Sequence, residues 1–346
     1  MKVNFTPVNT VQSYGINNIE ILDSNIIYTP TPFKNYKIEN QKECIVLNKT
    51  DTNTKQIISP ELQKQFLNAN ITNSIVIKKS TTAPIKINAM FNEQNNSLVD
   101  ILNIELQNNV KAQIIITYKG LPAYHNGLIK INMGKNSVLD IIVYSNFLGN
   151  NYLTIQDTKQ QNAKINYCII DFAQQNTIQN LYSTSLGENT KTQLDTMYFG
   201  KENAVVDLNY NVELTKPKNI ACLNTIGALS ENARKHYKGL INFIKGAKKS
   251  EGSENEYCIM LSKTAKSKSL PMLLCGEEDV TGSHSASAGK VDESALFYIM
   301  NRGINKTEAT KILVGAQFNS ITKNIFNEDI KNEILENIDR SINFEN

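Results

Sequence analysis

One histidine stands in a stretch whose residue types could bind a metal ion or exchange a proton. His284 lies within TGSHSASAG, a run of small Ser, Ala and Gly residues that leaves room for a ligand or a partner. An acidic triplet, Glu277 to Asp279, precedes it, and imidazole and carboxylate groups are both competent iron ligands. The plainer alternatives are a histidine that only forms hydrogen bonds at a surface or interface, and an acidic turn that is only solvated.

The thiols near His284 are too few to complete a cluster site within one chain. Cys275 lies nine residues before the histidine, and the five cysteines form no CxxC pair. Most iron–sulfur clusters are held by four thiolates, so further ligands would have to come from another chain. Cys275 is therefore a candidate ligand or, as small cysteines often are, a buried apolar residue. Cys168 and Cys258 lie in apolar runs and are predicted to belong to the core.

The other two histidines have ordinary interpretations. His125 lies in PAYHNG, which predicts a loop without a second ligand, and His236 lies among Arg234, Lys235 and Lys238, which predicts a solvated basic strand. A net charge of +3 and lysines without interleaved aromatic residues do not predict nucleic-acid binding. The chain has neither a Walker A sequence nor a dinucleotide fingerprint, so we expect no ATP binding.

A repeat of short strands would position these residues. From about residue 72 to 276, apolar residues alternate in short runs rich in Ile, Val and Tyr. Asparagines stand just before successive runs at spacings of 27, 26 and 27 residues, namely Asn109, Asn136, Asn162 and Asn189. A second set lies between or beside them, namely Asn96, Asn150, Asn176 and Asn203. The slot near residue 123 has no Asn, so the register is expected to slip there. Chance spacing is the alternative, because Asn is abundant.

Asparagine tolerates the left-handed backbone that the corners of a solenoid need. A strand every 13 residues, with two strands in each coil of about 26, falls within the repeat lengths of stacked solenoids. We therefore predict a mainly β protein with a parallel β-solenoid over residues 71–291.

The two ends of the chain differ from this core. Residues 1–70 are mixed and partly helical, with Pro60 placed to open a short helix through Leu67. Residues 292–346 are predicted to be helical. Asp292 would cap the first helix, Asn305 or Thr307 would begin the second, and Asn327 would cap the third. The apolar face of the second helix is expected to contain Ala309, Ile312, Leu313, Ala316 and Ile321.

Composition points to a cytoplasmic protein. The chain has 346 residues, of which 40% are apolar and 20% charged, and its odd, scattered cysteines do not suggest a disulfide framework. The first fifteen residues lack an apolar signal region, and no run approaches the 18 apolar residues of a membrane span.

The stretch around His284 also resembles a known family. The ordered run EDVTGSHSASAG at 278–289, followed by Asp292, LFY at 296–298 and RGI at 302–304, is similar to the signature of the SufB/SufD family, and most similar to SufD. These proteins are scaffolds of the SUF iron–sulfur cluster assembly machine. Two positions depart from the signature, because Gly282 stands where the family often has Cys and Ser285 stands where it has Gly.

The resemblance implies a right-handed parallel β-helix and a scaffold that is not an enzyme. It implies that His284 is a candidate iron or cluster ligand at a partner interface, with any iron–sulfur cluster transient and shared with the partner chain. It also implies docking of a SufC-like ATPase through residues 307–326 and pairing with a SufB-like subunit around His284, or with a second copy in its absence. Compared with SufD-like proteins, the N-terminal region looks reduced.

Three other functions remain open. A SufB-like homodimeric scaffold would need a cysteine near His284, and Gly282 weakens that hypothesis. A β-helix enzyme acting on carbohydrate would need converging carboxylates and usually a secretion signal. A non-catalytic β-solenoid binding module would account for the strands, but not for the ordered motif or the helical C-terminal region.

Overall fold

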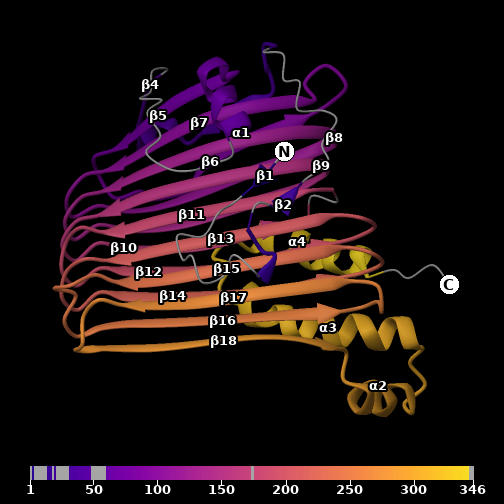
Figure 1. The fold of residues 1–346 in the computed structure, drawn as a ribbon. Helices are drawn as coiled ribbons and strands as arrows, with labels where there is room; N and C mark the ends of the chain where they lie inside the picture. The colour runs from indigo at the N-terminus through magenta and orange to yellow at the C-terminus, as the bar shows by residue number, and fades with distance from the viewer. Residues whose placement is uncertain are drawn as a thin grey trace.

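The computed structural model describes residues 2–3, 14–17, 19–20, 31–47, 60–172 and 175–342. These residues form a β-solenoid of about eight turns followed by C-terminal helices (Figure 1). The parallel solenoid predicted from the repeat is therefore confirmed.

Each turn contributes a strand to each of two faces, and the strands within a face pair in parallel. Face A comprises β6 (Ile85–Phe91), the first half of β8 (Lys111–Met133), the first half of β9 (Val138–Lys159), β10 (Lys164–Asp171), β12 (Lys191–Gly200), β14 (Ile220–Leu229), β16 (Ser250–Met260) and β18 (Val280–Lys290). Face B comprises β5 (Ile71–Ile77), β7 (Ser97–Leu106), the second halves of β8 and β9, β11 (Thr177–Ser185), β13 (Val205–Leu214), β15 (Arg234–Phe243) and β17 (Lys266–Cys275).

Short elements cover the N-terminal end of the solenoid. β3 (Tyr36–Glu39) pairs antiparallel with β6, and β4 (Ile45–Leu47), which follows the 3₁₀ helix η2 (Gln41–Glu43), pairs antiparallel with β5. The expected helix near Pro60 is confirmed as α1 (Pro60–Gln65), continued by η3 (Phe66–Asn68). It packs its Leu62 and Phe66 on the outside of face B. Two further strands, β1 (Lys2–Val3) and β2 (Ile19–Glu20), pair with each other.

The first set of asparagines forms a ladder along one corner. Asn109, Asn136, Asn162 and Asn189 all have positive φ, between 55° and 64°. The side-chain amide of each of the last three donates to the Oδ1 of the one before, over 2.8–2.9 Å. A short polar residue that accepts the left-handed conformation thus also links successive turns. Lys218 and Lys249 take the same conformation in the next two turns.

The second set of asparagines works differently. None of them has positive φ; in the opposite corner Glu202 and Glu231 take that conformation. Asn150 and Asn176 instead accept hydrogen bonds from backbone N–H groups of the next turn through their side-chain oxygens. The slip expected near residue 123 is confirmed as a register irregularity between Gly120 and Ala123.

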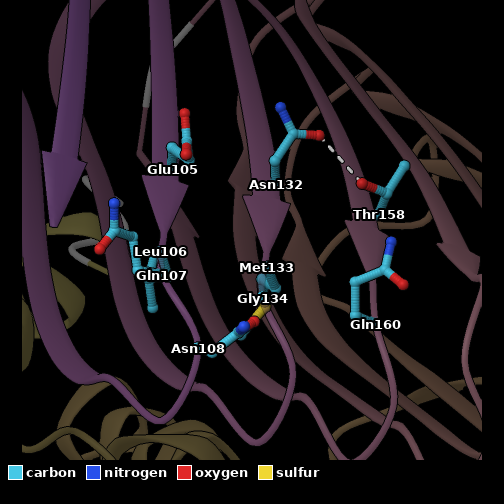
Figure 2. Close-up of a pocket in the computed structure, with 9 residues that line it drawn as sticks. All are labelled: Glu105, Leu106, Gln107, Asn108, Asn132, Met133, Gly134, Thr158 and Gln160. Carbon is cyan, nitrogen blue, oxygen red and sulfur yellow. Dashed lines mark hydrogen bonds between the residues drawn. The ribbon is translucent and has the colours of Figure 1, made fainter. Parts of the chain in front are cut away.

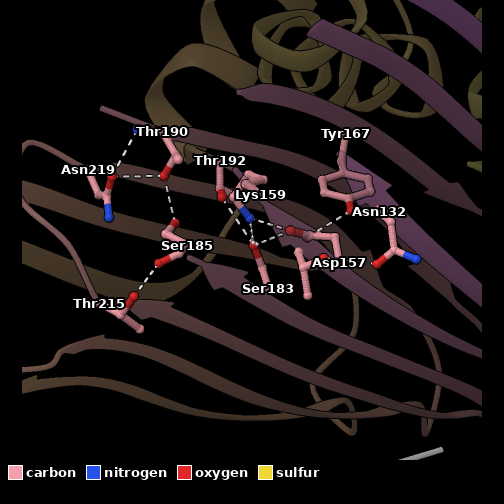
Figure 3. Close-up of polar contacts among 11 residues, drawn as sticks. Asn132, Asp157, Lys159, Tyr167, Ser183, Ser185, Thr190, Thr192, Thr215 and Asn219 are labelled. Atoms are coloured by element: carbon pink, nitrogen blue, oxygen red, sulfur yellow. Dashed lines mark hydrogen bonds and ion pairs between the residues drawn. The ribbon is translucent and has the colours of Figure 1, made fainter. Parts of the chain in front are cut away.

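The interior of the solenoid is mostly aliphatic, with polar side chains inserted at a few levels. Figure 3 shows one such group, in which the Lys159 ammonium donates to Asp157 and, over 2.7 Å, to Ser183. Tyr167 donates to the second oxygen of Asp157 over 2.9 Å. Both charged side chains are fully buried, so their mutual pairing and these hydrogen bonds replace the lost hydration.

Three helices follow the solenoid: α2 (Glu293–Met300), α3 (Lys306–Thr322) and α4 (Glu328–Ser341). The predicted caps are confirmed, because Asp292, Asn305 and Asn327 each accept hydrogen bonds from backbone N–H groups in the first turn of the helix that follows. Helices α3 and α4 pack on the outside of face A, where Tyr144 and Met197 join their apolar side chains.

The expected apolar face of α3 was only partly right. Ala309 and Ile321 are buried, but the main contacts with face A come from Val314 and Phe318, while Ile312 is half exposed. Apolar residues lie on more than one side of this helix, so the sequence did not show which side would pack against face A.

Candidate functional site

Strand β18, which carries His284, has one free edge. Among the described strands it pairs only with β16, so the backbone groups on its other edge have no partner strand. Figure 1 shows it as the last strand at the C-terminal end of the solenoid, with α2 beyond it. Its small side chains are almost all exposed, so in the part of the chain that the structure describes neither bulk nor a covering segment blocks this edge. Such an edge is a ready template for pairing with another chain.

His284 belongs to the row of β18 side chains that continues the interior of the solenoid. It is in register with Glu254 of β16. Along the first half of β16 buried side chains alternate with more exposed ones, and Glu254 is one of the buried ones. On β18 the same row has no further turn above it, so His284 is exposed. The outward-facing neighbour Ser285 donates a hydrogen bond to Asn255 over 2.9 Å, which fixes the register of the strand next to the histidine.

The carboxyl group one layer below His284 is the least satisfied buried acid near this site. Within the described residues, neither oxygen of Glu254 makes a hydrogen bond of normal geometry. Burial raises its pKa to about 7, although the nearby Tyr237 hydroxyl and Met272 N–H oppose the rise. The adjacent acid Glu256, by contrast, accepts from Lys235 over 2.6 Å. Sequence reasoning missed Glu254; the alternating pattern SEGSENEY was the available signal, since it places both acids on the interior row.

Gly282, at the position where the resemblance predicts a cysteine, lies close to another side chain. A Cβ atom at residue 282 would lie 2.9 Å from Cδ1 of Leu273. The side chain of Leu273 therefore occupies the space that a side chain on β18 would need at this position. A cysteine here would require Leu273 to change rotamer.

The other proposed ligands do not gather around His284. Cys275 is exposed at the end of β17, so the expectation of a buried residue was wrong. The strand ends there and leaves the thiol uncovered. Glu277 accepts from the Gly246 N–H over 2.9 Å, which lowers its pKa and stabilises the turn before β18. No group of three or more His, Cys, Asp or Glu side chains is arranged to hold a metal within the described part of the chain.

The interpretation of His125 was wrong. It is fully buried within β8, where its ring nitrogens lie 2.7 Å from Oδ1 of Asn151 and 3.0 Å from Oδ1 of Asp100. The Pro, Asn and Gly around it suggested a loop, but β8 continues through the corner and turns the histidine inward.

The interpretation of His236 was also wrong. It is buried, and burial lowers its pKa to about 4. Two of its basic neighbours are buried as well, and Lys235 pairs with Glu256 while Lys238 pairs with Asp207. The third, Arg234, is exposed as expected. The carboxylate partners of the two lysines are 21 and 31 residues away in sequence, so the local composition could not reveal them.

A second exposed feature lies at the same end of the molecule. Phe297 and Tyr298 of α2 are 66% and 59% exposed, and no residue of α2 is buried. The guanidinium group of Arg302 stacks over the Tyr298 ring, 4.6 Å from its centroid, so the ring is held in place but left open to solvent. Exposed aromatic side chains gathered on a short helix are typical of a protein contact.

A hollow lined by residues on and just after β7, β8 and β9 has no comparable set of candidate ligands. The hollow has a volume of about 620 Å³ and lies at a corner of the solenoid. Figure 2 shows its lining, in which the Asn132 side chain accepts a hydrogen bond from Thr158 over 2.9 Å. Among its described lining residues Glu105 is the one carboxylate. A pair of carboxylates, as glycoside hydrolysis requires, is therefore not present among these residues.

Comparison with known proteins identifies the family to which this chain belongs. Residues 89–317, about two thirds of the chain, match the family described as SUF system FeS cluster assembly, SufBD core domain. The chain therefore belongs to the SufBD family of iron–sulfur cluster assembly proteins.

Individual relatives agree with this assignment. The chain is 31% identical over 116 residues to the iron–sulfur cluster assembly protein SufD of Bacillus subtilis, a match covering 34% of this chain and 26% of that protein. It is 29% identical over 161 residues to SufD of Escherichia coli, covering 45% and 37%. A SufBD family protein of Staphylococcus epidermidis is 23% identical over 204 residues, covering 58% and 44%. Each match thus spans less than half of the relative.

No helix within the described residues has the length and apolar character needed to cross a membrane.

Proposed function

We propose that this chain is a SufD-like scaffold subunit that pairs with a SufB-like subunit through the free edge of β18. The observation that carries the proposal is the position of His284 on the interior row at the open end of the solenoid, one layer above Glu254. A partner strand added to this edge would cover that row and bring the partner's ligands next to the histidine. Iron or a nascent cluster is the cargo of this site, with His284 as one ligand and thiolates supplied by the partner.

The C-terminal helices supply the second contact. We propose that a SufC-like ATPase docks on the outer side of residues 307–326 together with α2. The inward side of α3 is occupied by face A, whereas Ile312 is 50% exposed and the aromatic side chains of α2 lie nearby in the fold. Movement of these helices would then be coupled to the β18 edge through Asp292, which caps α2 two residues after β18 ends. In this account the chain is a cytoplasmic scaffold and performs no catalysis itself.

The experiment is co-purification with the SufB-like and SufC-like proteins of its own source, followed by anaerobic reconstitution and measurement of iron and acid-labile sulfide. His284→Ala tests the ligand and Ser285→Arg tests the edge. Gln94→Arg, in an exposed turn at the other end, is the matched control. We expect His284→Ala to assemble with reduced iron and sulfide, Ser285→Arg to lose the SufB-like subunit, and the control to behave as wild type.

Two outcomes would contradict parts of this proposal. Unchanged cluster content in the His284→Ala complex would leave the chain an architectural subunit without a ligand role. Failure of the wild-type chain to bind either protein would overturn the SufD-like assignment and favour a plain solenoid binding module.

A homodimer is the second candidate, and the charges at the ends of β18 favour it. The strand follows the acidic triplet Glu277–Asp279 and ends at Lys290. Antiparallel pairing of two copies would place each Lys290 beside the acidic turn of the other, whereas parallel pairing would oppose like charges. Sedimentation of the isolated chain distinguishes the two, with Lys290→Glu weakening the dimer if it forms this way.

A further inference from the structure

A cavity of about 470 Å³ lies between α4 and the corner of the solenoid, far from the β18 edge in the order of strands. Residues from three turns and one helix contribute to its lining, among them Lys119, Asn146, Lys201, Glu333, Asn337 and Arg340. The volume is within the range of small-molecule sites. Three of these side chains are cationic and one is anionic, so the lining has an excess of positive charge.

The one carboxylate is already neutralised. Lys119 donates to Glu333 over 2.5 Å, and its ammonium lies 5.1 Å from the centroid of the Tyr144 ring. Asn337 donates to the Tyr144 hydroxyl over 2.5 Å, so this part of the wall is held in a fixed arrangement. The pair leaves Lys201 and Arg340 as the cations without a partner among the lining residues.

Lys201 is the more unusual of those two. It is half-buried, and its ammonium lies 5.4 Å from the centroid of the Phe199 ring. Within the described residues it has no hydrogen-bond acceptor or ion-pair partner. Burial lowers its pKa, whereas the charges of Glu231 and Glu202 act in the opposite direction. Arg340 has only an exposed pair with Glu336 at 3.3 Å, and such pairs contribute little.

We propose that this cavity binds a small phosphate-bearing anion, with Lys201 and Arg340 as the charged ligands and the amides of Asn146 and Asn337 as neutral donors. Lysine and arginine are the usual phosphate ligands, and a partly desolvated ammonium gains most from an anion placed beside it. Because α4 supplies one wall and the solenoid the other, a bound anion would hold this helix against face A. The proposal is independent of the proposed function.

The test uses the full-length chain without its partners, with pyrophosphate, ADP and citrate as probes in calorimetric titrations and thermal unfolding. Lys201→Met keeps the apolar stem over Phe199 and removes the charge; Lys201→Arg restores it. Lys135→Met, at an exposed corner elsewhere, is the matched control. We expect saturable binding of a phosphate probe that raises the unfolding temperature. Lys201→Met should weaken it about tenfold, as loss of one charged hydrogen bond implies, and the arginine variant should recover it.

Glu333→Gln gives a test of opposite sign. Removing the carboxylate leaves Lys119 free to contact the anion, so affinity should increase about threefold or more. The thermal unfolding of each variant without ligand checks that the fold is intact. Binding of citrate alone would replace phosphate with carboxylate as the ligand chemistry and overturn the proposal. It would also be overturned if no probe bound saturably, or if Lys201→Met and Lys135→Met bound the phosphate probes equally well.

Discussion

Among the buried charges of the solenoid, a group in the middle and one at the C-terminal end have different surroundings. In the middle, Lys159 and Asp157 are paired, and Ser183 and Tyr167 supply further hydrogen bonds. At the C-terminal end, Glu254 is as deeply buried but makes no hydrogen bond of normal geometry, and the Tyr237 hydroxyl beside it also lacks one within the described structure.

The difference follows from position in the stack. A residue in the middle has a turn on each side from which partners can come, and the network of Figure 3 draws on β9, β10, β11 and β12. Glu254 lies one layer from the last strand, and above it the row ends at the exposed His284. The central group is therefore fully paired, whereas the terminal acid Glu254 is not.

The largest expected effect is at the central pair. Lys159→Met should lower the free energy of unfolding by about 3–5 kcal/mol, because it leaves Asp157 buried without a counter-charge. The check is urea unfolding followed by circular dichroism. The double variant with Asp157→Asn should recover most of the loss, since no charge remains buried. A cost below about 1 kcal/mol for the single variant would show that Asp157 does not depend on this lysine.

Replacing the terminal acid Glu254 should raise the free energy of unfolding, in contrast to the loss at Lys159, and should do so only at higher pH. The pKa of Glu254 is raised from 4.5 to about 7 in the folded chain, so between these values the unfolded state releases a proton that the folded state retains. Stability is therefore lost as pH rises through this window, by about 3 kcal/mol in total. Glu254→Gln should match wild type near pH 4 and exceed it by about that amount at pH 8.

Glu256→Gln is the matched control for that measurement. Its carboxylate pairs with the buried Lys235, so its removal should destabilise the chain instead of stabilising it. Unfolding curves collected from pH 4 to pH 8 for both variants decide the matter. Parallel pH profiles for wild type and Glu254→Gln would mean that the terminal acid is as well compensated as the central one.

A smaller effect is expected at the corner formed by the asparagine ladder, where the side chains lie at the surface but are hydrogen-bonded to one another. Asn162→Ala removes two ladder hydrogen bonds and puts alanine at a φ of 60°, which together should cost about 2 kcal/mol. Asn162→Gly accepts the same backbone and should cost about half as much. Equal losses for the two variants in urea unfolding would mean that the left-handed conformation carries no penalty here.

The smallest effect is expected at His284. Its side chain is exposed, so His284→Ala should change the free energy of unfolding by less than about 0.5 kcal/mol. Differential scanning calorimetry of the isolated chain measures this directly. A loss of more than about 1 kcal/mol would give the histidine a structural role and remove the contrast with the central pair.

Much of the architecture was predictable because it depends on local requirements. Asparagines at a spacing of 26 or 27 residues marked the left-handed corners, and Asp292, Asn305 and Asn327 marked the starts of the helices. Each of these residues satisfies a need of its own backbone or that of its immediate neighbours, so the sequence contains the signal. The run from Glu278 to Ile304 likewise indicated the family, which the comparison over residues 89–317 confirmed.

The surroundings of single side chains were not predictable in the same way. His125 was predicted in a loop and His236 on a solvated strand, and both lie in the interior. For Cys275 a buried position was one of two alternatives, and its side chain is exposed. Whether a polar residue is buried depends on strands one turn away, such as those carrying Asn151 and Asp207. Local composition says nothing about those strands.

The sequence by itself determined the repeat, the corners, the helix caps and the family, because periodicity and backbone conformation are encoded locally. Tertiary structure alone decided which charges are paired, which face of α3 is covered and that Glu254 lies beneath His284. Those outcomes depend on the register between turns, which brings together residues about 30 positions apart in the chain. The stacking of parallel strands is thus what turns a repeated pattern into one closed interior and one open end.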